Sequence, residues 1–140
     1  MPPGDFDPEH FHHHLRHRWA GTAEAWHRWW RILERGGSGC SEWLLDLAQL
    51  QPGQQELDLA TGISEPALSA TRRVAPGGHA VGVDSSSRML ELARLRAAER
   101  AMDDVIFRVA DAETLPDLPA APFDAVLSRW GLMLLPNPAG

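Results

Sequence analysis

Three aspartates whose carboxylates could hold the hydroxyl groups of a ligand stand at or beside the ends of short apolar runs. Asp58, Asp84 and Asp111 accompany the runs at 56–59, 80–83 and 105–109, and about one strand-and-helix unit separates each from the next. In an open parallel sheet, ligands bind outside the carboxyl ends of the strands. The spacing therefore predicts that the three carboxylates converge on one crevice.

The turn after the first run has the features of a ligand-binding loop. Residues 57–66, LDLATGISEP, lead through small residues into a helix that Pro66 can begin. Gly62 allows a ligand to approach the backbone, and the helix start behind it offers free N–H groups. Asp84, at the end of the second run, is placed to accept hydrogen bonds from both ribose hydroxyls of an adenosine. Together these features predict a nucleoside-containing cofactor.

Further positions suit an adenine ring. Asp111 can accept a hydrogen bond from the adenine amino group, while Ala112 leaves room for the ring. Met89, one turn into the helix after Asp84, can cover an adenine face. Ser85 and the two serines after it offer hydroxyls that cap this helix.

The elements that must position these residues alternate between strands and helices. Apolar runs at 56–59, 80–83, 105–109 and 125–127 predict four strands, and helices are expected at 66–74 and 88–101. This pattern predicts an α/β fold with parallel strands joined by right-handed crossovers. We expect residues 51–140 to form the cofactor-binding domain.

The segment before the strands is predicted to be helical. Tryptophans and leucines recur at helical spacing from Trp19 to Leu33, and residues 36–39, GGSG, are expected to end that helix. Ser41 can then cap a second helix. We expect residues 1–50 to form helices that dock on the domain. The tryptophans fit docking residues better than a binding cage.

Composition narrows the class of protein. The 140 residues carry a formal net charge of −6, with 44% hydrophobic and 23% charged residues. This balance is typical of a globular domain and argues against a nucleic-acid partner, which needs clustered basic residues. The single cysteine excludes an internal disulfide. No segment is apolar enough to span a membrane, so we expect a cytoplasmic protein. The histidines at 10–17 are expected to be solvated, and we predict no metal site.

Four segments resemble, in order and spacing, the motifs of class I S-adenosylmethionine-dependent methyltransferases, and within them the type-11 group related to quinone-biosynthesis C-methyltransferases. LDLATGIS at 57–64 is similar to the glycine-rich motif I, and GVDSSSRMLELAR at 82–94 to the acidic loop and its helix. ADAETLP at 110–116 is similar to the adenine-contact motif, and FDAVLSRWGLMLLP at 123–136 to the fourth strand.

This resemblance implies a Rossmann-like three-layer fold, S-adenosylmethionine as cofactor and a small-molecule methyl acceptor. It also implies that the helices of residues 1–50 can act as a lid over the site. The cofactor-binding residues that it implies are Asp58, Ala60, Gly62, Ile63, Asp84, Ser85, Met89, Asp111, Ala112 and Arg129. Arg129 is expected either beside the methionine end of the cofactor or the substrate, or in an ion pair with a helix carboxylate. No catalytic base, acceptor identity or oligomeric state follows from these residues.

The chain departs from the resembled family in two ways. Of the three motif I glycines only Gly62 is present, with Ala60 and Ser64 at the outer positions. We expect ordinary backbone at Ala60 and a weakened cofactor site through Ser64. The family fold has seven strands and this pattern has four, so we expect a truncated domain.

Two alternatives remain open at this point. A truncated chain can be a non-catalytic remnant that binds the cofactor at most weakly. A nicotinamide-dependent oxidoreductase would require GxGxxG after the first strand, which residues 60–65, ATGISE, do not supply.

Overall fold

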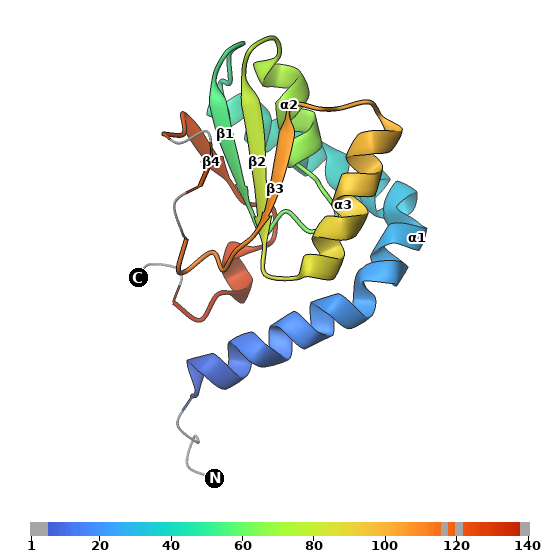
Figure 1. Cartoon of the computed structure of the whole chain (residues 1–140), viewed down its shortest axis with the longest axis vertical. Coiled ribbons are helices and arrows are strands. Elements are labelled where there is room, and N and C mark those ends of the chain that lie inside the picture. Colours follow the sequence, from blue (N-terminus) through green and yellow to red (C-terminus); the bar gives the residue numbers. More distant parts are fainter. Residues whose placement is uncertain (1–5, 116–117, 120–121, 138–140) are drawn as a thin grey trace.

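Four parallel strands form one sheet in the computed structural model, which describes residues 6–115, 118–119 and 122–137. The strands β1 (Gln55–Leu59), β2 (His79–Asp84), β3 (Val105–Val109) and β4 (Ala125–Leu127) lie in the order β3-β2-β1-β4 (Figure 1). The register pairs Leu57 with both Val81 and Val126. The predicted parallel α/β arrangement is confirmed.

Helices cover one face of this sheet. Helices α2 (Ala67–Val74) and α3 (Ser87–Glu99) follow β1 and β2, and both lie on the same side as the end of the long first helix (Figure 1). The core on this face joins residues from all three helices, Leu45, Val74 and Leu90 among them. In the described residues no helix covers the opposite face, where the chain after β3 packs on Leu57 and Val81.

The N-terminal segment is one continuous helix, α1 (Pro8–Ala48), so the predicted break at 36–39 is wrong. Its first half extends past the sheet, and its last turns lie behind the strands (Figure 1). Glycines cost a helix about 1 kcal/mol each relative to alanine. The burial of Ser41 and Leu45 beyond them compensates for that cost. None of the helices in the described parts of the chain combines the length and apolar character needed to cross a membrane.

A close contact explains one of the helical glycines. A Cβ atom at Gly37 would lie 2.8 Å from Nη1 of Arg129, which comes from the loop after β4. The missing side chain therefore allows the guanidinium to approach the helix backbone. In this sequence the glycine that was expected to end the helix instead provides room for a contact between the helix and the domain.

Tight packing in the sheet gives a first prediction. A Cβ atom at Gly82 in β2 would lie 2.9 Å from the Phe107 ring and 2.9 Å from Cγ2 of Thr61. We expect Gly82→Ala to lower the free energy of unfolding by about 1–3 kcal/mol, the usual cost of overpacking. Urea unfolding of the native chain and of Gly82→Ala measures this difference in the free energy of unfolding.

A matched control is available in α1. Gly39→Ala adds the same methyl group where nothing lies within 4 Å, so it should leave the helix as stable or more stable. If Gly82→Ala unfolds at the same urea concentration as the native chain, this packing account is wrong.

Candidate functional site

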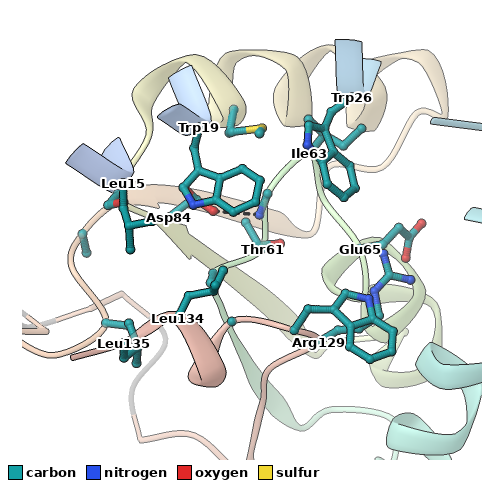
Figure 2. Close-up of a pocket in the computed structure, with 18 of the residues that line it drawn as sticks. Leu15, Trp19, Trp26, Thr61, Ile63, Glu65, Asp84, Arg129, Leu134 and Leu135 are labelled. Carbon is teal, nitrogen blue, oxygen red and sulfur yellow. Dashed lines mark hydrogen bonds between the residues drawn. The ribbon is translucent and has the colours of Figure 1, made fainter. Parts of the chain in front are cut away.

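A pocket opens at the carboxyl ends of the strands, between the loops that follow all four strands and the long helix α1 (Figure 2). Four loops and one helix thus meet there, as expected from the topology of a parallel sheet. Nine of the ten predicted cofactor-binding residues line this pocket: Ala60, Gly62, Ile63, Asp84, Ser85, Met89, Asp111, Ala112 and Arg129. The tenth, Asp58, is fully buried beneath the loop.

Asp84 is held in place by backbone N–H groups on both sides. Its Oδ2 accepts a hydrogen bond from the Gly62 nitrogen at 2.9 Å, and its Oδ1 accepts one from the Ser86 nitrogen at 2.9 Å. Burial raises the pKa of Asp84, and these two hydrogen bonds lower it in part. Each carboxylate oxygen retains acceptor capacity toward the pocket.

The loop after β1 has an unusual backbone. Ala60 has φ of 57°, Gly62 of 58° and Ser64 of 105°, all in the left-handed region. The expectation of ordinary backbone at Ala60 is therefore wrong. Non-glycine residues in such conformations cost roughly 1–3 kcal/mol each and persist where the surroundings hold them. Here the Thr61 nitrogen donates to the carbonyl oxygen of Val83 at 2.9 Å, which ties the loop to β2.

Asp58 supports this loop from below. Its Oδ2 accepts a hydrogen bond from the Ala67 nitrogen at 3.2 Å, at the start of α2. Burial raises the pKa of Asp58 to about 7, although that hydrogen bond and the charge of Arg129 lower it. Glu56, two residues earlier, is also fully buried, and burial followed by the charge of Asp58 raises its pKa well above the usual value.

The raised pKa of Asp58 predicts a pH-dependent stability. In the unfolded chain the carboxyl group ionises near 3.8, and in the folded chain near 7, so stability is lost as pH rises through this window. We expect Asp58→Asn, which keeps an acceptor for the Ala67 nitrogen, to be more stable than the native chain above this window. Below it the two should be alike.

Denaturant unfolding at both ends of the pH window checks this expectation. Asp103→Asn is the matched control, because Asp103 is exposed and its substitution should change little at either pH. An Asp58→Asn variant that is equally destabilised at every pH would contradict the assignment of a costly buried charge.

The third strand's loop meets the N-terminal end of α1. The His12 ring lies with Nδ1 at 3.2 Å from Oδ2 of Asp111 and Nε2 at 2.6 Å from Oε2 of Glu113. These three side chains come close enough together for a metal ion, but the two contacts of the imidazole already account for their proximity. His12 was expected to be solvated, and no sequence signal pairs a histidine in this tract with a residue a hundred positions later.

Arg129 forms an ion pair with a helix carboxylate, one of the two arrangements that the sequence left open. Its Nη1 lies 3.0 Å from Oε1 of Glu34 and donates a hydrogen bond to Oγ of Ser41 at 2.8 Å. Both partners belong to α1. This contact anchors the helix over the pocket, opposite the aspartates.

An apolar wall closes the pocket on the side of α1. Trp19, Trp26 and Trp30 pack against Ile63 and Met89, and Figure 2 shows Trp19 and Trp26 over the loop that carries Thr61 and Ile63. The sequence favoured docking over a binding cage for these tryptophans, and in the structure they do both: they dock α1 and line the pocket. Leu134 and Leu135 line the pocket from the chain after β4.

Three charged residues that line the pocket were not predicted: Glu34, Glu65 and Arg96. None of them belongs to a recognised motif position. Arg96 follows Met89 by seven residues on α3, so the two share a helix face. That spacing was the available signal, since Met89 had already been expected to face the ligand.

Comparison with known proteins agrees with this geometry. The profile of a family described as "Methyltransferase domain" matches residues 50–140. The chain is 36% identical over 94 residues to nocamycin O-methyltransferase of Saccharothrix syringae, covering 67% of this chain and 33% of that protein. It is 42% identical over 87 residues to demethylmenaquinone methyltransferase of Thermus thermophilus, covering 62% of this chain and 38% of that protein.

A solved structure shares the fold of this chain. The crystal structure of an S-adenosylmethionine-dependent methyltransferase from Aquifex aeolicus matches 70% of this chain and 52% of its own with a TM-score of 0.63, at 20% identity. The chain spans between a third and about half of the length of the proteins named here. No comparison favours the nicotinamide-dependent alternative. The chain belongs to the methyltransferase-domain family, among the class I S-adenosylmethionine-dependent methyltransferases related to quinone C-methyltransferases.

Proposed function

We propose that this chain binds S-adenosylmethionine in the pocket at the carboxyl ends of its strands, and that the protein transfers the methyl group to a small molecule. The observation that carries the proposal is Asp84, a partly buried carboxylate at the end of β2 that is held by two backbone N–H groups and turned toward the pocket. An acidic residue in this position accepts hydrogen bonds from ribose hydroxyls.

The residues around Asp84 fit the rest of the cofactor. Ser85, Met89, Asp111 and Ala112 line the part of the pocket that we assign to adenine. The loop residues Ala60, Gly62 and Ile63, with Arg129, line the part that we assign to the methionine end, and Asp58 supports this loop from its buried position. Residues 51–140 would thus be the cofactor-binding domain, and residues 1–50 its lid.

The bound cofactor would supply a methyl group already activated by a sulfonium. The chain's own residues then have to hold acceptor and methyl group in line and keep water away. In this proposal the tryptophan wall of α1 excludes water, and the ion pair of Arg129 with Glu34 holds α1 in place. No metal ion is needed for these roles.

The acceptor is proposed to be an apolar small molecule. Its place would be beside the methionine end, where Trp26, Trp30, Leu134 and Leu135 line the pocket. Similarity to enzymes named for nocamycin and demethylmenaquinone supports a small-molecule acceptor. The formal net charge of −6 argues against a nucleic-acid acceptor.

A transfer assay tests the proposal. The chain is incubated with S-adenosylmethionine and a panel of apolar acceptors that includes demethylmenaquinone, and formation of S-adenosylhomocysteine is followed by mass spectrometry. Acceptor-dependent product that disappears in Asp84→Asn is expected. Cofactor binding without transfer to any acceptor would instead favour the non-catalytic alternative.

A further inference from the structure

A buried guanidinium in the pocket lacks partners for most of its donors. Arg96 of α3 is 1% exposed, and its Nη1 donates to the carbonyl oxygen of Ile63 at 2.6 Å. Its Nε and Nη2 have no hydrogen-bond partner among the described residues. The guanidinium carbon lies 4.4 Å from the centre of the Trp30 ring, which places the cation over that ring. Buried charged donors without acceptors are costly, so this arrangement points to a missing anion.

A carboxylate lies in the same part of the pocket. Glu65 is 9% exposed and accepts a hydrogen bond from Oγ of Ser69 at 2.8 Å. Burial raises the pKa of Glu65, the charge of Glu34 raises it further, and the charge of Arg96 lowers it. Glu34 is already bound by Arg129, whereas Glu65 forms no ion pair within 4 Å among the described residues, so its carboxylate is available to a cation in the pocket.

The loop after β1 connects these two groups with the position proposed for the ribose. Gly62, which donates to Asp84, precedes Ile63, whose carbonyl oxygen accepts from Arg96. Glu65 follows two residues later in the same loop. A ligand that holds its ribose at Asp84 would therefore extend along this loop toward a buried cation and a buried anion.

We propose that Arg96 and Glu65 form a subsite for a zwitterion, in which Arg96 binds the carboxylate and Glu65 the ammonium group of the cofactor's amino-acid end. This inference rests on the proposed function. A guanidinium presents planar donors that match a carboxylate, and charge-assisted hydrogen bonds of this kind are among the strongest in proteins. The subsite explains why the pocket keeps two opposite charges where an apolar pair would be cheaper to bury.

Two ligands that differ only in the amino-acid end test the subsite. S-Adenosylhomocysteine carries the zwitterion, and methylthioadenosine keeps the nucleoside thioether without it. Their affinities for the native chain, Arg96→Gln and Glu65→Gln are measured by calorimetry, with free methionine as a third ligand. Arg100→Gln is the matched control, because Arg100 stacks on the same Trp30 ring at 4.8 Å without lining the pocket.

We expect the native chain to bind S-adenosylhomocysteine more tightly than methylthioadenosine. Arg96→Gln and Glu65→Gln should each lower the affinity for S-adenosylhomocysteine about ten- to hundredfold, as expected for a lost charge-assisted hydrogen bond. The affinity for methylthioadenosine should stay unchanged. Arg100→Gln should change the affinity for neither ligand. Free methionine should bind far more weakly than S-adenosylhomocysteine, because it lacks the nucleoside.

Other results would overturn the subsite. If the native chain binds S-adenosylhomocysteine and methylthioadenosine with equal affinity, the subsite is wrong. This comparison uses no variant, so it holds whether or not Arg96→Gln folds. Equal weakening of both ligands in the variants would assign Arg96 and Glu65 a structural role only. If neither nucleoside binds the native chain, the proposed function itself fails, which is a distinguishable outcome.

Discussion

Asp84→Asn is expected to weaken binding of S-adenosylhomocysteine about a hundredfold, because two ribose hydroxyls lose a charged acceptor at once. The substitution keeps the size of the side chain but leaves one oxygen where there were two. The amide nitrogen would then face either the Gly62 nitrogen or the Ser86 nitrogen, both of which are donors. The loop after β1 is therefore expected to loosen in the same variant.

Calorimetric titration measures the affinity, and urea unfolding measures the accompanying loss of stability. Asp104→Asn provides the control, since Asp104 is exposed in the turn before β3 and should bind the ligand as the native chain does. If Asp84→Asn binds S-adenosylhomocysteine with native affinity, the ribose assignment is wrong.

Trp26→Ala should destabilise the chain by about 3 kcal/mol and also weaken ligand binding, because the Trp26 indole packs α1 onto the domain and lines the pocket. The ring lies edge-on to Trp19 with 6.2 Å between the ring centres, in the cluster that contains Ile63 and Met89. Truncation of a packed tryptophan to alanine costs about 3–5 kcal/mol when the side chain is fully buried. Trp26 is partly buried, so we expect the lower end of this range.

The same helix provides the comparison. Trp29 is 55% exposed and does not line the pocket, so Trp29→Ala removes an equal side chain with little expected effect on unfolding or affinity. If Trp26→Ala and Trp29→Ala have the same stability and the same ligand affinity, α1 is not a lid over this site. Loss of stability without loss of affinity in Trp26→Ala would limit the helix to a docking role.

The strands could be predicted from the sequence because their signals are local. Each apolar run that was expected to form a strand does so within one residue at either end, and the topology of a parallel sheet then brings Asp84 and Asp111 to one edge. The helix after β2 begins at Ser87 with the Ser86 hydroxyl accepting from the Met89 nitrogen, as the serines indicated.

The features that the sequence did not reveal depend on contacts between distant segments. Three glycines predicted a helix end at 36–39, but the approach of Arg129 to Gly37 and the burial of Leu45 keep α1 continuous. Local propensity is a weak guide where tertiary packing opposes it.

Two side chains illustrate the same limit within the site. Asp58 matches a motif position and still turns away from the pocket, because the start of α2 offers it a backbone N–H group. His12 lies in a tract without any motif and contacts Asp111, which is far from it in the sequence. In both cases the partner, and not the residue type, decides the role.

Cofactor binding by the chain itself is the measurement that tests this account most directly. The purified chain is titrated with S-adenosylmethionine and, separately, with NAD, while circular dichroism establishes that it is folded. We predict one site with a dissociation constant in the micromolar to millimolar range for S-adenosylmethionine and no response to NAD. A folded chain that binds NAD, or that does not respond to S-adenosylmethionine, would contradict the assignment of this pocket.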